Sequence, residues 1–265
     1  MQFIKYLLAI LTLINTAYSN EYDFKNYTVV DGLSESTINV IFEDDKGFLY
    51  IGTENGLGLF DGLAFFNYKM NVFNETTIFG NNIKSLCQDD YGDIWVGTEL
   101  GLSKLDTRTR KFKRIANSKY NLKDIEKIFT DNNGNIWFRN SDGIYKYEQT
   151  SSEVECISCG DNLEINSFSN IYSTHSNEIL ISTFSNLYRY DFDSDTLRSM
   201  LNSNNSTIEI SFVTDIIEID NTLWIGSKNG LIKLPYDQKL KPQVYKEKTS
   251  SLVNDDIRDI EFSKK

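Results

Sequence analysis

Apolar residues along this chain recur in short runs, and the runs return in the same order several times. Residues 38–61 read INVIFEDDKGFLYIGTENGLGLFD, and residues 83–106 read IKSLCQDDYGDIWVGTELGLSKLD. Segments of the same form occupy residues 125–148, 168–191 and 213–235, and a partial one begins at Ile257. One column recurs every 42 to 45 residues and holds Tyr50, Trp95, Trp137, Leu180 and Trp224. The chain is therefore predicted to repeat one structural unit five times and to begin a sixth.

Within each repeat, the spacing of apolar residues indicates strands rather than helices. In the second repeat a first apolar run ends at the turn Asp89–Gly92, an aromatic-centred run follows, and a short turn leads into a third run. A weaker fourth run closes the repeat, as at residues 110–115 and 154–158. Four short antiparallel strands in about 40 to 45 residues are typical of a β-propeller blade. We predict an all-β propeller of five four-stranded blades plus the start of a sixth, which makes it incomplete.

The first nineteen residues, MQFIKYLLAILTLINTAYS, have the form of a secretory signal peptide. Lys5 precedes the apolar run Tyr6–Ile14, and small residues stand at the cleavage positions before Asn20. That run is too short to cross a bilayer as a helix, and no later apolar run reaches 18 residues. We therefore expect a cleaved chain whose propeller domain covers residues 20–265, located in the periplasm, with no membrane span.

The charge of the chain bears on its partners. It has 27 Lys and Arg residues against 38 Asp and Glu, a net charge of −11. Such a surface repels phosphate backbones, so nucleic-acid binding is not predicted. One basic cluster interrupts the acidic composition. This cluster consists of Arg108, Arg110, Lys111, Lys113 and Arg114. It could bind an acidic ligand, or its charges could protect the outer edge strand of a blade from unwanted pairing. We favour the second interpretation.

Residues that often carry chemistry are few. His175 is the single histidine and falls in a turn, which argues against a zinc site or a Ser/His/Asp triad. The Asp-x-x-Gly turns lack the ligands of a calcium loop and are more typical of Asx turns. We predict no cofactor and no metal. In an oxidising compartment Cys156 and Cys159 are candidates for a short local disulfide, and Cys87 is predicted to be a buried free thiol.

The repeated columns themselves have two possible roles. The aromatic column of Tyr50, Trp95, Trp137 and Trp224 is suited to packing between blades or to a ring that stacks on sugars, and we favour packing because each residue sits mid-strand. A glycine follows two positions later. Glycine within a strand is expected where a neighbour approaches closely, and packing is again the favoured explanation; these positions are Gly52, Gly97 and Gly226.

These columns resemble the two-component regulator propeller repeat, of the form V-x-x-I-x-x-D-x-x-G-x-L-W-I-G-T-x-x-G-L-x-x-x-D. The second repeat matches almost throughout and the first and fifth match well. The third departs at Arg139–Asn140, and the fourth lacks the Trp and both Gly. The resemblance covers nearly all of the chain after residue 19. It implies the N-terminal, periplasmic sensor part of a hybrid two-component histidine kinase of the Bacteroidetes, a ligand-sensing module for a glycan-derived oligosaccharide, here without kinase or membrane parts.

Two other classes of function stay open. Propellers hold catalytic carboxylates in some glycan-active hydrolases and lyases, and others are protein-interaction scaffolds. Hydrolysis needs two carboxylates about 5 to 10 Å apart. Acidic residues here recur mainly at turn columns, so a non-enzymatic binding module is favoured. The repeat pattern singles out no ligand-contacting residue.

The two ends of the repeat array are expected to govern closure. Tyr27–Val30 is predicted to be an outer strand that seeks the last blade, and Asp256–Phe262 the first strand of a sixth blade. Five full blades with two unpaired strands are expected to form an open arc, or a strained ring if blade 1 meets blade 5. Either form leaves exposed edges and faces, which invite pairing with the remaining blades of a longer sensor, or self-association.

Overall fold

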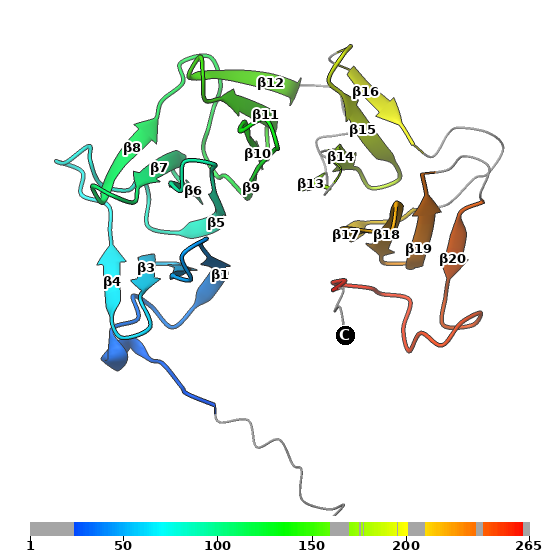
Figure 1. The fold of residues 1–265 in the computed structure, drawn as a ribbon, viewed down its shortest axis with the longest axis horizontal. Coiled ribbons are helices and arrows are strands. Elements are labelled where there is room, and N and C mark those ends of the chain that lie inside the picture. Colours follow the sequence, from blue (N-terminus) through cyan, green and yellow to red (C-terminus); the bar gives the residue numbers. More distant parts are fainter. Residues whose placement is uncertain are drawn as a thin grey trace, which may run out of the picture.

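Five four-stranded antiparallel sheets stand side by side around an arc (Figure 1). This computed structural model describes residues 24–159, 170–174, 176, 178–194, 196–200, 210–236 and 241–261. The predicted signal peptide and His175 lie outside these residues. Within them, sheet order follows chain order, and the first strand of each blade lies nearest the centre of the arc while the fourth lies at the rim. The prediction of an all-β propeller with four-stranded blades is confirmed.

The strands of each blade follow the predicted runs closely. Blade 1 contains β1 (Ile38–Glu43), β2 (Leu49–Thr53), β3 (Gly56–Phe60) and β4 (Phe65–Tyr68). Blade 2 contains β5 (Ile83–Gln88), β6 (Ile94–Thr98), β7 (Leu102–Asp106) and β8 (Lys111–Ile115). Blade 3 contains β9 (Lys127–Thr130), β10 (Ile136–Asn140), β11 (Gly143–Glu148) and β12 (Glu153–Cys159). Blade 4 contains β13 (Asn170–Ser173), β14 (Ile179–Ser182), β15 (Leu187–Asp191) and β16 (Thr196–Ser199). Blade 5 contains β17 (Val213–Ile219), β18 (Thr222–Ser227), β19 (Gly230–Pro235) and β20 (Gln243–Tyr245).

An aspartate closes the first hairpin of blades 1 to 3. In blade 2, Asp89 Oδ1 accepts hydrogen bonds from the backbone N–H groups of Tyr91 and Asp93, both at 3.0 Å. Gly92 between them has a φ of 80°, a left-handed conformation that glycine adopts without strain. Asp44 and Asp131 make the equivalent bonds in blades 1 and 3. These are Asx turns, and their aspartates are buried.

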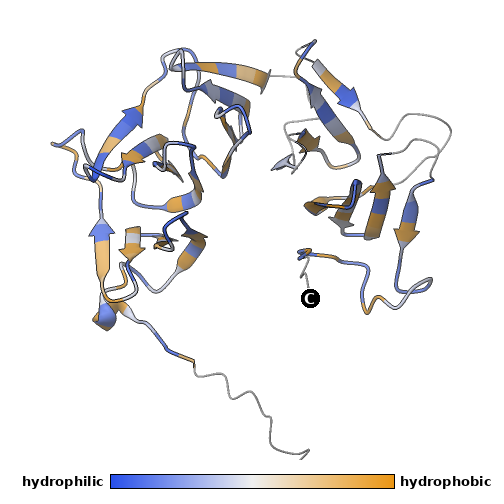
Figure 2. Ribbon diagram, in the orientation of Figure 1, coloured by the Kyte–Doolittle hydropathy of each residue, from blue (hydrophilic) through white to orange (hydrophobic). Residues whose placement is uncertain are grey.

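Alternating residues of each second strand face the two neighbouring blades. Ile94 and Val96 pack with residues of blade 1, whereas Trp95 between them packs against blade 3. Because successive strand residues point to opposite faces, a single strand contributes to both interfaces. Figure 2 shows apolar residues within the strands of all five blades. Each blade is therefore held by burial of apolar area on both of its sides.

Hydrogen bonds and a close contact at a glycine join blade 2 to blade 3 near the centre of the arc. The N–H of Ile125 donates to the Thr98 carbonyl at 2.9 Å, and the N–H of Ile128 donates to Ser85 Oγ at 3.0 Å. A Cβ on Gly97 would lie 2.7 Å from Ile125 Cγ2. The residues that lead into β9 thus lie against the end of β6, and β9 itself lies beside β5, the first strand of blade 2.

The C-terminal segment makes the same contacts on blade 5. The N–H of Ile257 donates to the Ser227 carbonyl at 3.0 Å, and the N–H of Ile260 donates to Asp215 Oδ2 at 3.1 Å. The segment was predicted to be a strand over Asp256–Phe262, but its described part, to residue 261, is not a strand. It has no neighbouring strand to pair with among the described residues. It occupies the place of the next blade's first strand, bonded to the preceding blade alone.

The N-terminal prediction is wrong in its secondary structure. Tyr27–Val30 is not an outer strand, because a short 3-10 helix, η1 (Val29–Asp31), replaces it. Thr28 caps this helix, Asp31 bonds back to the Thr28 N–H at 2.8 Å, and Gly32 ends it at a φ of 106°. This reciprocal capping satisfies the backbone locally, so the segment needs no partner strand.

Residues around this helix cover the open face of blade 1. Leu33 is buried against Ile51 and Phe60, and the ring of Tyr27 lies 5.0 Å from that of Phe60 in an edge-to-face arrangement. Closer to the centre of the arc, the side chain of Ile41 in β1 remains largely exposed to solvent.

Among the described residues, no helix combines the length and apolar character that a membrane crossing requires.

We expect the tryptophans of the repeat to differ in their contribution to stability. Trp95 is fully buried, so Trp95→Ala should lower the free energy of unfolding by about 3 to 5 kcal/mol. Trp224, on the far face of blade 5, is partly exposed, and Trp224→Ala should cost less than about 2 kcal/mol. Urea melts followed by circular dichroism measure both. Equal losses would contradict the assignment of these faces.

Candidate functional site

The aromatic column lies mostly inside the stack of blades. Trp95 and Trp137 are fully buried, and their indole N–H groups donate to Asp89 Oδ2 at 2.9 Å and to Asp131 Oδ2 at 2.8 Å. Neither ring face is free to stack on a ligand. Trp224 stacks on Tyr245 with ring centroids 6.0 Å apart.

The three glycines of the second strands admit a neighbouring residue at short range. Gly97 contacts Ile125, as described above. A Cβ on Gly52 would lie 2.7 Å from Ile83 Cγ2, and a Cβ on Gly226 would lie 3.0 Å from Ile257 Cγ2. An alanine at these positions must displace the first residue of the next repeat. The glycines thus serve contact between consecutive repeats.

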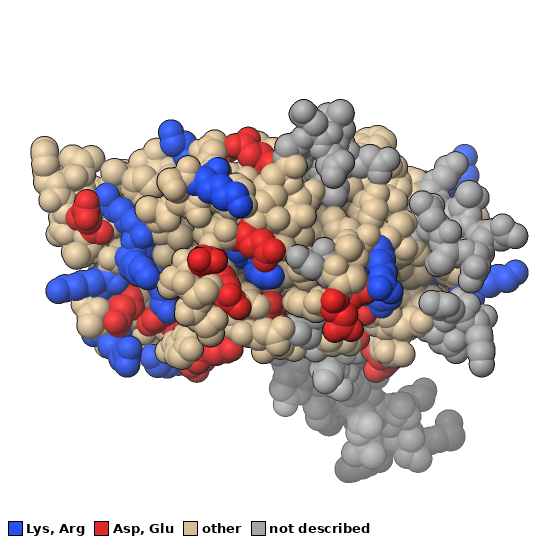
Figure 3. Space-filling view, turned by 90° about the horizontal axis from the view of Figure 1, so that it is seen from above, with Lys and Arg blue, Asp and Glu red and all other residues tan. Residues whose placement is uncertain are grey.

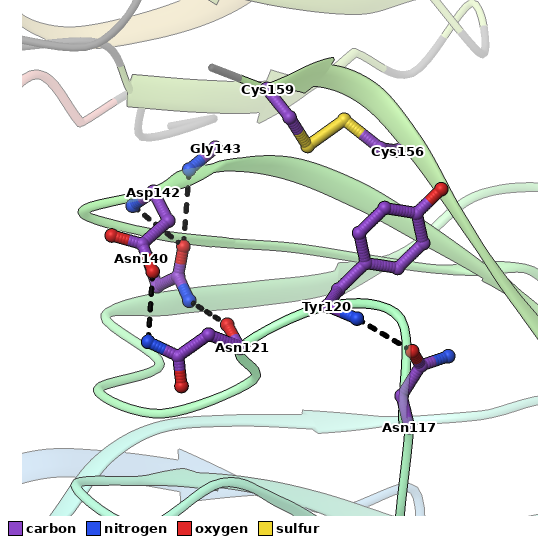
Figure 4. The surroundings of a disulfide bond; sticks show 8 residues. All are labelled: Asn117, Tyr120, Asn121, Asn140, Asp142, Gly143, Cys156 and Cys159. Carbon is purple, nitrogen blue, oxygen red and sulfur yellow. Dashed lines mark hydrogen bonds between the residues drawn. A yellow bond between two sulfur atoms is a disulfide. The ribbon is translucent and has the colours of Figure 1, made fainter.

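Cys156 and Cys159 form a disulfide at the end of β12 (Figure 4). The register of β11 with β12 shifts at this point, so the bridge spans a bulge. Tyr120 and both cysteines pack against the same buried cluster. Nearby, Asn140 Oδ1 accepts from the N–H groups of Asp142 and Gly143, at 2.9 and 3.1 Å. This is the role that a threonine side chain has in blades 1 and 2, so the departure at Asn140 keeps the turn.

Other groups singled out in the sequence do not assemble into a reactive site. Cys87 is buried and unpaired by disulfide, and burial raises the pKa of its thiol to about 12. No cluster of three or more His, Cys, Asp or Glu residues suited to a metal ion occurs in the described ranges.

A pocket of about 140 Å³ opens between blades 1 and 2, on the side of the β1–β2 turn. Its lining combines charged side chains with aliphatic and aromatic ones. The lining consists of Asp44, Lys46, Phe48, Tyr50, Leu59, Asp61, Phe66, Tyr68, Leu105, Thr107 and Arg110. Strands β2, β3 and β4 of blade 1 and β7 of blade 2 contribute lining residues, and Figure 1 shows these two blades next to each other.

The pocket exists because blade 1 lacks an ion pair that blade 2 has. In blade 2, Lys104 Nζ lies 2.8 Å from Asp89 Oδ2 and 3.1 Å from Asp93 Oδ2, and covers the Trp95 ring at 5.5 Å. The repeat places Leu59 and Phe48 of blade 1 at the positions of Lys104 and Asp93. An apolar pair therefore replaces the charged pair, and no lysine closes the site.

The same replacements leave one carboxylate oxygen available. Asp44 is 6% exposed, and its Oδ1 accepts from the N–H groups of Lys46 and Phe48, at 3.0 and 2.9 Å. In blades 2 and 3 the equivalent Oδ2 accepts an indole N–H, but the aromatic residue of blade 1 is Tyr50. Asp44 Oδ2 has no hydrogen bond or ion pair within the described part of the chain. This oxygen can therefore accept a hydrogen bond from a ligand that enters the pocket.

Around this carboxylate the pocket offers donors and ring faces. The Arg110 guanidinium lies 4.9 Å above the Phe66 ring, and both side chains are exposed. Phe48 is 37% exposed at the opposite rim. Burial, followed by the charge of Asp44, raises the pKa of Tyr50, so its hydroxyl stays protonated. The arrangement suits a small polar molecule with hydroxyl groups and an apolar face.

The basic cluster has mixed roles. Figure 3 shows basic side chains gathered at the end of the molecule where β8 forms the rim. Arg114 anchors the loop before β5, donating to the carbonyls of Asn71 and Asn74, each at 3.1 Å. Arg110 lines the pocket, whereas Lys111 and Lys113 are exposed to solvent on the outer strand.

The pocket was not predicted from the sequence. The aligned repeats nevertheless indicate it, because Leu59 and Phe48 stand where the second repeat has Lys104 and Asp93.

Comparison with known proteins gives sequence matches to part of the chain. Residues 32–55 and 77–99 match the family model described as Two component regulator propeller. A stretch of 72 residues, 27% of this chain, is 38% identical to Histidine kinase P4 of Formosa agariphila and covers 5% of that protein. The chain thus corresponds to a small part of this relative.

Solved structures share the fold. The extracellular domain of a putative hybrid two component system from Bacteroides thetaiotaomicron is similar with a TM-score of 0.63 and 20% identity, over 80% of this chain and 30% of that one. Virginiamycin B lyase from Staphylococcus aureus is similar with a TM-score of 0.61 and 11% identity, over 86% of this chain and 75% of that one. At these identities the likeness concerns the propeller architecture alone.

We expect the cysteines to be distinguishable by thiol counting. The chain has three Cys. Because its pKa is about 12, Cys87 should carry about a thousandfold less thiolate at pH 8 than an unfolded cysteine, and native protein should not react with a thiol reagent. Denaturant alone should release one reactive thiol, and denaturant with a reductant three. Three thiols without reductant would contradict the disulfide.

Proposed function

We propose that this chain, which carries two-component regulator propeller repeats, is the ligand-binding module of an extracytoplasmic sensor in a two-component system and recognises a glycan-derived oligosaccharide. The observation that carries the proposal is the pocket between blades 1 and 2, with Asp44 Oδ2 unused at its base. The repeat family and the histidine kinase relative support the sensor role.

The pocket matches the chemistry of one sugar ring. Its volume of about 140 Å³ is close to the roughly 150 Å³ of a protein cavity that holds benzene, so one six-membered ring can enter it. Sugar hydroxyls donate to carboxylates and accept from guanidinium groups, which Asp44 and Arg110 supply. The apolar face of a pyranose packs on aromatic rings such as Phe48 and Phe66, the exposed pair at the rim.

The lowered pKa of Asp61, the second carboxylate of the pocket, favours binding without catalysis over a glycan-active enzyme. Asp61 lines the same pocket, but hydrogen bonds from the backbone N–H groups of Ala64 and Leu63 lower its pKa. Glycoside hydrolysis requires a protonated general acid, which calls for a raised carboxyl pKa. Asp61 is poorly suited to that role, so the pocket is better explained as a recognition site.

Titration calorimetry with the mature chain against neutral oligosaccharides tests this proposal. Phe66→Ala should weaken binding about two- to tenfold by loss of ring contact. Asp44→Asn keeps the turn acceptor but removes the charge, and should weaken binding about tenfold or more. Phe73→Ala, at a loop residue that is 96% exposed and outside the pocket, is the matched control and should leave affinity unchanged.

Two results would contradict the proposal. One is affinity for an oligosaccharide that Phe66→Ala and Asp44→Asn both leave intact, which would place recognition elsewhere. The other is release of reducing sugar or of an unsaturated product by the purified chain, which would make it an enzyme.

A further inference from the structure

The interface between blades 3 and 4 carries two cations side by side. Lys127 of β9 and Arg139 of β10 are directly opposite each other in the antiparallel register. Like charges at such positions repel each other and destabilise a sheet. The repeat places a glycine at the Arg139 position in blades 1, 2 and 5, and the serine Ser85 at the Lys127 position in blade 2. This interface therefore departs from the repeat in the direction of positive charge.

The two cations are incompletely neutralised by their surroundings. Arg139 forms an ion pair with Glu126 through one terminal nitrogen, while its Nε is buried without a hydrogen-bond partner. Lys127 Nζ lies 4.4 Å above the ring of Tyr172 in blade 4. It makes no hydrogen bond or ion pair with any described residue. Arg139 Nε and Lys127 Nζ, on residues directly opposite each other, thus both lack an acceptor among the described residues.

The remaining charged neighbour does not complete the site. Asp215 of blade 5 acts on Lys127 through its charge from beyond ion-pair distance, and burial raises the pKa of Asp215. Burial also lowers the pKa of Lys127, since a half-buried ammonium loses hydration that nothing replaces. An anion placed between the two cations relieves both the repulsion and the lost hydration.

We propose that the inner end of the interface between blades 3 and 4 is a binding site for an oxyanion, a carboxylate or sulfate group held by Lys127 and Arg139 above Tyr172. Carboxylates and sulfate accept several N–H donors at once and pair well with a guanidinium. The Tyr172 ring and the amide of Asn170, which donates to the Tyr172 hydroxyl at 3.1 Å, form its blade 4 wall. This site is separate from the pocket at blades 1 and 2.

Calorimetry at constant ionic strength, with chloride as the balancing ion, tests the proposal. The probes are sodium sulfate, sodium acetate, galacturonate and, as the neutral counterpart, galactose. Sulfate or carboxylate should bind at one site. Lys127→Gln should weaken that binding about tenfold or more, because one charge-assisted hydrogen bond is lost. Lys113→Gln removes the same charge from the exposed outer strand and should change affinity less than twofold.

Two further variants keep the test decisive. Lys127→Arg retains the charge and should retain binding, which guards against a Gln variant that fails to fold. Asp44→Asn should leave anion binding intact, so failure here and failure of the saccharide pocket are distinguishable. Galacturonate that binds more tightly than both acetate and galactose identifies an acidic sugar, and equal binding of sulfate and galacturonate identifies the oxyanion alone. No binding of any anion, or Lys127→Gln binding within twofold of wild type, would overturn the proposal.

Discussion

A blade of this propeller is a thin sheet with two apolar faces, and neither face is stable in water. Blade 2 shows how the constraint is met: Ile94 and Val96 are covered by blade 1, and Trp95, one residue away, by blade 3. Alternation along one strand thus ties a blade inside the arc to both of its neighbours. Because each interface needs close approach, Gly97 is as much a part of it as the rings are.

The same constraint explains what happens where a neighbour is lacking. On blade 1 the chain covers its own sheet with Tyr27 and Leu33, held in place by a capped 3-10 helix. On blade 5 the segment from Ile257 lies across Gly226, while Trp224 keeps partial exposure. The two ends of the arc are therefore covered by irregular segments, through side-chain packing and through a few hydrogen bonds to the preceding strands.

Periodicity alone predicts the blades, because five repeats report the same alternation. It fails at the N-terminus, since Thr28 and Asp31 satisfy each other's backbone and no periodic signal records that. The candidate sites are harder still. The pocket depends on Leu59 and Phe48 changing together, 11 residues apart in the chain, and becomes visible once the repeats are superimposed. The paired cations Lys127 and Arg139 likewise lie where the third repeat differs from the others. From the sequence alone this difference is indistinguishable from loss of the repeat pattern, and its meaning becomes clear once the strand register is known.

The link from Ile125 to Thr98, and its counterpart from Ile257 to Ser227, has a kinetic meaning. Blade 3 and the C-terminal segment are each tied to the blade before them by this bond, and the bonded residues lie 27 and 30 positions apart in the chain. Loops of that size close cheaply, and their entropy grows only slowly with length. Assembly is therefore expected to run from the N-terminus toward the C-terminus, each finished sheet serving as the template on which the next begins, at the pace at which the chain emerges.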